Sequence, residues 1–175
     1  AACLGRPQPL DPPGLTPFQT AVALARGSSL GHGGDSLIYS NYEGEASPVS
    51  NGAAYHRSVF DVVGFCDEAF DAAEDVEFNY RVEQAGLRCY TSHRLTVRYY
   101  PRESLSLLFR QMKRYGIGRS RFLAKHPAAR TLNQVVPACF VLGLLLLLAA
   151  WLCVLVTGRG KPALALLSLP YAVYL

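Results

Sequence analysis

The pattern of polar and apolar positions divides the chain of 175 residues into two unequal parts. Residues 1–134 carry charges and turn residues throughout, as a water-soluble domain does, whereas residues 135–156 contain no charged side chain. A helix of about 20 apolar residues is long enough to cross the hydrocarbon layer of a membrane. We therefore predict a transmembrane helix over residues 135–156. A polar turn at 157–162 and the apolar stretch after it predict the start of a second transmembrane helix over residues 163–175.

Basic residues are concentrated immediately before the first apolar run, at Arg110, Lys113, Arg114, Arg119, Arg121, Lys125 and Arg130. Lys and Arg accumulate on the cytoplasmic side of membrane spans, so we expect a multi-pass protein of the cell (inner) membrane with a cytoplasmic soluble part. Arg159 and Lys161 in the short turn also favour the cytoplasmic side and leave the opposite orientation open. The five cysteines lack the spacing of a metal site or of a disulfide framework, which fits a reducing compartment.

Short helices and strands are predicted within the soluble part. Residues 5–15 are rich in proline and cannot form regular structure. A helix should begin after them, because Thr16 is a typical N-cap, Pro17 suits the first helical position and Gln19 completes a capping box. The remaining elements are expected as strands over residues 37–39, 87–90 and 95–100, and as helices over residues 55–62, 71–86 and 104–115.

Two of these predicted helices have distinctive patterns. The helix over residues 71–86 opens with Asp71 and Glu74 as an acidic capping pair and ends at Gly86. The helix over residues 104–115 is amphipathic, with apolar side chains at helical spacing and basic side chains on its other faces. Such a helix suits a membrane surface or the joint between a domain and a membrane.

Three motifs follow one another in this part of the chain. They are V-G-F-C-D-E-A-F at residues 63–70, E-D at residues 74–75 on a helix that also carries Arg81, and Q-M-K-R-Y-G at residues 111–116. In this order, and followed by an apolar span, they resemble the second half of family 2 glycosyltransferases of the GT-A fold. The family pattern runs G-x-F-D-E-x-F, then E-D, a helical Arg, a Gly and finally Q-x-x-R-W. The stretches 101–105 and 114–119 are similar to the bacterial exopolysaccharide and succinoglycan-type transferases of this family.

The resemblance implies an α/β fold and a membrane-bound hexosyltransferase. Residues 1–103 would form the carboxy-terminal half of the GT-A domain, and residues 104–134 would form interface helices ahead of the spans at 135–156 and 163–175. The enzyme would transfer a sugar with inversion from a nucleotide-diphospho-sugar donor to a saccharide or lipid-linked acceptor, in polysaccharide biosynthesis. A divalent metal, Mg²⁺ or Mn²⁺, is expected to be held by a D-x-D pair outside this chain, so the chain alone is expected to be inactive.

By the same resemblance, Asp75 is the general base that takes the proton of the acceptor hydroxyl. Glu74 would cap the helix or position the acceptor. The first turn of a helix favours an ionised carboxylate, which helps a base that works beside a negatively charged diphosphate. The alternative is that Glu74 and Asp75 are ordinary acidic residues at a helix start.

The third motif is expected to bind the donor. The guanidinium of Arg114 offers a planar fork that matches phosphate oxygens, and Gln111 and Arg114 are expected to contact the diphosphate. Tyr115 replaces the Trp of the family and is expected to stack on a sugar face, and Arg119 is assigned to the same site. The alternative for Arg114, Arg119 and Arg121 is contact with anionic lipid.

Two further expectations concern the rest of the domain. Asn51 and Gly52 lie in a small-residue segment expected near the donor sugar and the acceptor, although such a segment is also typical of an ordinary turn. Arg81 is expected to form a buried ion pair with Glu68 or Glu77. No residue of the chain is expected to ligate the metal.

The alternative function is a non-catalytic membrane scaffold that binds anionic lipid through the basic helix ahead of residue 135. It predicts that Glu74 and Asp75 are dispensable and that the basic residues are not. A membrane phosphotransferase acting on lipid carriers would need further carboxylates near the membrane, and residues 104–134 contain none. Membrane lipid is an expected partner for the transferase and for the scaffold, and nucleic acid is not.

Overall fold

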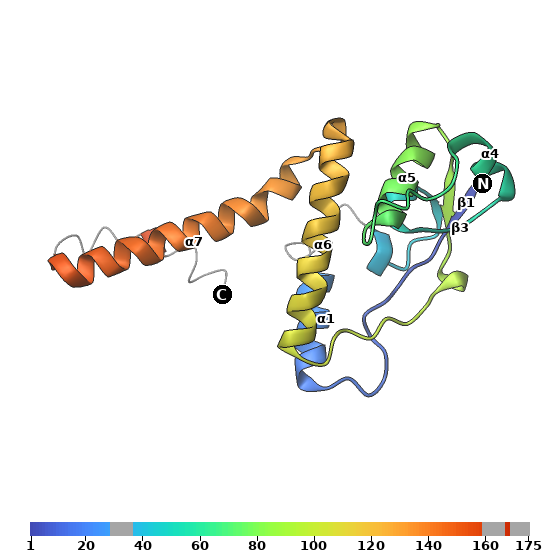
Figure 1. Ribbon diagram of the computed structural model, residues 1–175. Coiled ribbons are helices and arrows are strands. Elements are labelled where there is room, and N and C mark those ends of the chain that lie inside the picture. The colour runs from blue at the N-terminus through green and yellow to red at the C-terminus, as the bar shows by residue number, and fades with distance from the viewer. Residues whose placement is uncertain (29–36, 159–166, 169–175) are drawn as a thin grey trace. The chain divides into compact units, whose positions relative to one another are not determined.

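The computed structural model describes residues 1–28, 37–158 and 167–168 (Figure 1). The chain separates into two compact units, Ala1–Ala128 and Ala129–Leu175. The first unit holds a small sheet and its helices, and it includes the long helix α6 (Leu105–Lys125). The second unit contains helix α7 (Leu132–Thr157). All the residues predicted to bind substrate or to act in catalysis lie in the first unit.

The sheet of the first unit has four short strands, β1 (Cys3–Gly5), β2 (Gly44–Ala46), β3 (Gly52–Tyr55) and β4 (Cys89–Thr91). Their order in the sheet is β2-β4-β1-β3. Strands β1 and β4 are parallel, with Cys3 opposite Cys89, and the two outer pairs are antiparallel. The unit is therefore mixed α/β, with a mixed sheet that is consistent with part of a GT-A domain.

Two helices, α4 (Arg57–Val63) and α5 (Glu74–Gln84), pack against this sheet. The buried apolar side chains that join them to the strands are Cys3, Val59, Phe78, Val82 and Cys89. The ring of Tyr55 packs edge-on against that of Phe78, at a centroid distance of 4.8 Å. The ring of Phe60 packs against it in a tilted orientation, at a centroid distance of 5.5 Å. This core fixes the position of α5, whose first residues are the predicted acidic pair.

The predicted start of the first helix is confirmed. Helix α1 (Pro17–Gly27) begins after Thr16, whose hydroxyl accepts from the Gln19 N–H at 3.2 Å while the Gln19 amide oxygen accepts from the Thr16 N–H at 3.0 Å. The buried Gln19 amide also donates to Pro101 O at 2.9 Å. Helix α1 is therefore attached to the segment that leads into α6.

Two of the predicted strands are wrong. Residues 37–39 form the 3-10 helix η1 (Leu37–Tyr39), because the Ser40 N–H turns back to Leu37 O. Leu95 ends a second 3-10 helix, η2 (His93–Leu95). Among the described residues, 96–100 donate two backbone hydrogen bonds to the amino-terminal segment, from Val97 N–H to Pro7 O and from Tyr99 N–H to Pro9 O. Proline has no N–H to return, so a full ladder cannot form.

Several predicted boundaries also shift. The strand expected over residues 87–90 is β4, which begins at Cys89 and ends at Thr91. The helix expected over residues 55–62 is α4, which begins at Arg57 after His56 as N-cap, because Tyr55 ends strand β3. The short helix α3 (Pro48–Asn51) was not predicted.

The two distinctive helices differ from their predicted lengths. Helix α5 begins at Glu74 and not at residue 71, because its N-cap Ala73 has a left-handed backbone with φ of +63°. Asp71 therefore lies in the preceding loop and does not cap the helix. Helix α6 continues ten residues beyond Tyr115 to Lys125, through Gly116 and Gly118, which are usual helix terminators.

Helix α7 of the second unit carries the predicted first span. Within the part of the chain that the structure describes, its segment Gln134–Thr157 is the one helix long and apolar enough to cross a membrane. It ends at Gly158, which adopts the left-handed backbone typical of a helix C-cap. The second predicted span, over residues 163–175, lies outside the described residues apart from 167–168.

Candidate active site

The predicted acidic pair opens helix α5. Glu74 and Asp75 are the first two residues of the helix, and both side chains are exposed. One carboxylate oxygen of Asp75 accepts from the Val76 N–H at 2.8 Å. Both carboxylates thus lie at the positive end of the helix dipole. The exposed Asp75 side chain is open to a bound hydroxyl, from which a carboxylate can accept a proton.

One face of α6 covers the loop that leads to this pair. This face is formed by Arg114, Gly118, Arg121 and Lys125. Their spacing of three and four residues places them on one side of the helix. The Arg114 guanidinium donates to Asp71 O at 2.6 Å, and the Arg121 guanidinium donates to a carboxylate oxygen of Asp71 at 2.9 Å. The third motif is therefore in direct contact with the segment immediately before Glu74.

The closest approach between α6 and this loop is at Gly118. A Cβ atom at Gly118 would lie 2.5 Å from Ala72 O and 3.0 Å from the Cβ of Ala73. Ala73 is the residue before Glu74 and has the strained left-handed backbone. A glycine is therefore required at position 118 for α6 to lie against the start of α5.

Glu77, one turn into α5, holds the end of α6. Its side chain is completely buried, and its carboxylate accepts from Arg81 at 3.0 Å, from Lys125 at 2.7 Å and from the His126 ring at 3.0 Å. Burial acts to raise the pKa of this carboxyl, but the three hydrogen bonds outweigh it and lower the pKa to about 2. Of the two partners expected for Arg81, Glu77 is confirmed.

Arg119 is electrostatically linked to the predicted base. Burial of its guanidinium lowers the pKa of Arg119, and the negative charge of Asp75 acts in the opposite direction. The side chain still reaches solvent. The structure thus places Arg119, three residues beyond the third motif, within electrostatic range of Asp75.

Gln111 and Tyr115 belong to a polar cluster beside α1. The buried Gln111 amide donates to the hydroxyl oxygens of Tyr99 and Tyr115, at 2.8 and 3.0 Å. The amide oxygen of Gln111 is buried and has no hydrogen-bond partner among the residues that the structure describes. The Tyr115 side chain is 44 % exposed. Its ring therefore has a face that a ligand can reach.

Gly52 also contacts the helix of the acidic pair. A Cβ there would lie 2.5 Å from the amide oxygen of Asn79, one turn beyond Asp75. Gly52 O accepts from the Asn79 amide at 3.1 Å, and the Tyr55 hydroxyl donates to the Asn79 amide oxygen at 2.8 Å. The backbone of Asn51 ends α3 directly before this contact. The small-residue segment is therefore joined to α5 through its backbone.

The expected metal has no visible ligand set in this part of the protein. Among residues 1–28, 37–158 and 167–168, no three His, Cys, Asp or Glu side chains lie together as a metal site. The residues described therefore do not fit a bound Mg²⁺ or Mn²⁺, and no step through a metal is derived from them.

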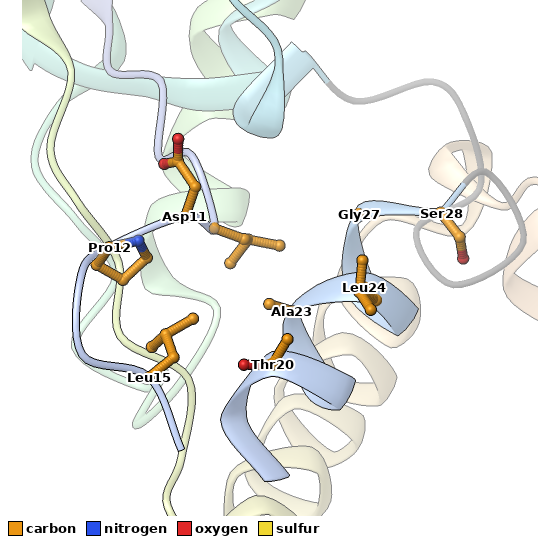
Figure 2. A pocket seen from close by; sticks show the side chains of 9 residues that line it. Asp11, Pro12, Leu15, Thr20, Ala23, Leu24, Gly27 and Ser28 are labelled. Atoms are coloured by element: carbon orange, nitrogen blue, oxygen red, sulfur yellow. The ribbon is translucent and has the colours of Figure 1, made fainter. Parts of the chain in front are cut away.

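A mainly apolar cavity lies away from these residues. It has a volume of about 590 Å³ and lies between the proline-rich segment and α1 (Figure 2). Its lining is mainly apolar and includes Leu10, Leu15, Ala23 and Leu24. None of the predicted site residues lines this cavity. Glu74, Asp75 and Arg114 lie instead where α6 meets the start of α5, and Gln111 and Tyr115 lie in the polar cluster beside α1.

Sequence reasoning missed Gly118, Arg26 and Tyr99, and of the contacts of Glu77 it identified only the one to Arg81. Gly118 approaches Ala72 in the loop before Glu74, Tyr99 accepts from Gln111, and Arg26 donates to Tyr99. The spacing of Gly118 from Arg114 on one helical face was a usable signal. The partners of Glu77 at Lys125 and His126 lie 48 and 49 positions away, so no local pattern could have indicated them.

Comparison with known proteins identifies the family of the chain. The family model "Glycosyl transferase family group 2" matches residues 17–175, which include every predicted site residue. The chain is 36% identical over 148 residues to the succinoglycan biosynthesis protein ExoA of Rhizobium meliloti (strain 1021). The matched part is 83% of this chain and 44% of ExoA, so the chain spans less than half of that relative. No solved structure matches the chain. The chain belongs to family 2 of the glycosyltransferases.

Proposed function

We propose that the complete protein transfers a hexosyl group, with inversion, from a nucleotide-diphospho-sugar to a saccharide or lipid-linked acceptor at the membrane. The observation that carries this proposal is the packing of α6 onto the loop before Glu74 and Asp75. This packing brings an exposed carboxylate at a helix start together with the cations of the third motif. The name of the relative ExoA supports polysaccharide biosynthesis as the process.

In the proposed reaction, Asp75 is the general base. An acceptor hydroxyl attacks the anomeric carbon from the face opposite the diphosphate, and its proton passes to the Asp75 carboxylate. The bond from the anomeric carbon to the diphosphate oxygen breaks, and the nucleotide diphosphate leaves with the electron pair. The positive charge of Arg119 interacts with the Asp75 carboxylate. Glu74, the first residue of the helix, positions the acceptor.

The third motif is proposed to hold the donor. A guanidinium has five N–H donors, and the structure uses one amino group of Arg114 on Asp71 O. The remaining donors of Arg114 are proposed to contact the diphosphate, where they stabilise the charge of the leaving group. Gln111 and the partly exposed ring of Tyr115 are proposed to contact the sugar. A divalent metal supplied by other parts of the protein would neutralise further charge.

The small-residue segment at Asn51 and Gly52 is proposed to border the acceptor. Gly52 is in contact with Asn79, one helical turn from Asp75, so a ligand beside this segment would lie next to α5. The absence of a side chain at Gly52 permits this close approach.

The scaffold alternative fits the structure less well. It requires the cations ahead of residue 135 to be available to lipid headgroups. Arg114, Arg121 and Lys125 instead donate to protein oxygens of the loop and of Glu77. Binding of anionic lipid is therefore assigned to the exposed Arg110 and Lys113, as an aid to a membrane enzyme that α7 anchors. We propose that the first unit faces the cytoplasm of a multi-pass protein.

A transfer assay with defined stereochemistry tests this function. Membranes that carry the complete protein are incubated with a panel of α-configured nucleotide-diphospho-sugars, and the anomeric configuration of the product is measured by NMR. The proposal predicts a β-linked product with at least one donor. A product that retains the α configuration would exclude Asp75 as the base of an inverting transfer, and no product with any donor would contradict the proposed activity.

A further inference from the structure

Arg26, in the last turn of α1, lies between two tyrosine rings. Its guanidinium donates to the Tyr99 hydroxyl oxygen at 3.1 Å and to the Tyr39 hydroxyl oxygen at 2.6 Å. The same guanidinium lies 5.0 Å from the centroid of the Tyr99 ring and 5.6 Å from that of the Tyr39 ring. A planar fork that meets two acceptors and two aromatic rings has little freedom to move.

The Tyr99 hydroxyl connects Arg26 to the third motif. It accepts from Arg26 and also from the Gln111 amide, which donates a second hydrogen bond to the Tyr115 hydroxyl. Arg26 has only donors, so its partner oxygen is held in place as an acceptor. Although burial acts to raise the pKa of Tyr99, the hydrogen bonds from Gln111 and Arg26 lower it, as strong donation to its oxygen requires.

Helix α1 is itself fixed to the segment that carries Tyr99. The Gln19 amide, at the other end of the helix, donates to Pro101 O, and this side chain is buried. The capping box of Thr16 and Gln19 fixes the helix start. Helix α1 is therefore attached at both ends to residues 99–101, which immediately precede α6. A hydrogen-bonded chain on such rigid elements can hold a binding group in a productive geometry.

We infer that Arg26 is a positioning residue for the donor site: through Tyr99 it holds the Gln111 amide and the Tyr115 ring in the place where they meet the sugar. The inference rests on the proposed function, and it adds a residue that lies outside all three motifs. Arg26 contacts neither member of the acidic pair in the structure, so its effect on transfer must pass through Tyr99 and Gln111.

The test uses the complete protein in membranes, with Arg26→Lys, Tyr99→Phe and the double variant. Arg26→Lys keeps the charge but loses the fork, and Tyr99→Phe removes the oxygen that links the fork to Gln111. Each single change should lower kcat/KM for transfer about tenfold, mostly through a higher donor KM, and the double variant should lose no more than the larger single effect. Arg57→Lys, the same change at an exposed arginine of α4, should stay within about twofold of wild type.

The outcomes separate the inference from the proposed function. Normal kcat/KM in Arg26→Lys, or losses that multiply in the double variant, would overturn the inference while transfer by wild type and its dependence on Asp75 stand. If Arg26→Lys does not accumulate as folded protein, Tyr99→Phe decides alone, and an unchanged kcat/KM overturns the inference. If wild-type membranes transfer no sugar, the proposed function and the inference fail together.

Discussion

The two sides of helix α6 have opposite surroundings. On the side toward α5, every position of the stripe from Arg114 to Lys125 contacts the loop at residues 67–73 or Glu77. On the other side, Leu105, Phe109 and Met112 are exposed, and a Cβ at Gly116 would meet no atom within 4 Å. One helix face therefore contacts the loop before the predicted acidic pair, while the other is exposed. Similar substitutions on the two sides should therefore have different results.

The largest difference is expected between the two glycines of the helix. Gly118→Ala places a Cβ against the backbone oxygen of Ala72, which cannot rotate away, so α6 must move off the start of α5. We expect a loss of about 2 kcal/mol in the free energy of unfolding, as for overpacking, and a fall in transfer of about 10²-fold, as for a misplaced reacting group. Sugar transfer by membranes and thermal unfolding in detergent measure the two effects.

Gly116→Ala is the matched control, two residues away on the open side. It should leave transfer unchanged and stabilise the protein by about 0.5–1 kcal/mol, because alanine is the better helix former. Equal losses in the two variants would show that the two sides of α6 do not differ as described.

The next largest effect is expected at Glu77. Glu77→Gln removes the charge that Arg81, Lys125 and His126 share, and leaves the half-buried donors of Arg81 and His126 and the exposed ammonium of Lys125 facing a neutral amide. We expect about 3 kcal/mol of destabilisation, as when one partner of a buried ion pair is removed. Glu68 is an exposed glutamate in the loop before α5, and Glu68→Gln should change the free energy of unfolding by less than about 0.5 kcal/mol. Similar unfolding midpoints for the two variants would contradict a holding role for Glu77.

The pH dependence of unfolding gives a second measure of the same carboxylate. The pKa of Glu77 is lowered from 4.5 to about 2 in the folded protein, so the folded state binds the proton less readily than the unfolded state. The stabilising contribution of Glu77 is complete above pH 4.5 and is lost as the pH falls toward 2. Acid unfolding of wild type should therefore be steeper in this interval than that of Glu77→Gln.

A smaller effect is expected when Arg114 and Arg110 are compared. Arg114→Lys keeps the charge but cannot hold Asp71 O and a diphosphate with one planar fork, so the donor KM should rise about tenfold. Arg110→Lys, one turn earlier and exposed, should leave the donor KM within about twofold. Normal turnover by Arg114→Lys at low donor concentration would remove Arg114 from the donor site and leave it as an anchor of the loop.

A helix or strand could be predicted from the sequence where the interactions that fix it join residues close together in the chain. The start of α1 was predicted correctly because the capping box of Thr16 and Gln19 is complete within four residues. The order of the three motifs identified the loop, the acidic pair and the helix that meet in the structure. The expected strand at residues 95–100 failed because its partner, residues 7–9, has proline where a ladder needs N–H groups.

The length of α6 and the hydrogen bonds that start at Arg26 could not be predicted, because both depend on residues far apart in the sequence. Gly116 and Gly118 predict a helix end. In the structure the helix continues through both, and position 118 must be glycine because a Cβ there would collide with the backbone of Ala72. The chain from Arg26 through Tyr99 to Gln111 joins residues separated by 73 and 12 positions. Such interactions are set by tertiary packing, which a single sequence does not display.

Asp75 is proposed as the base of the transfer reaction, and its replacement by asparagine tests this role. In the complete protein, Asp75→Asn is nearly isosteric and keeps an oxygen that can accept the Val76 N–H, but it cannot take a proton at neutral pH. We expect transfer by membranes to fall by about 10²-fold or more while nucleotide-sugar affinity is retained, and Glu74→Gln to cost less. If Asp75→Asn keeps more than about a tenth of wild-type turnover, Asp75 is not the base and the mechanism is contradicted.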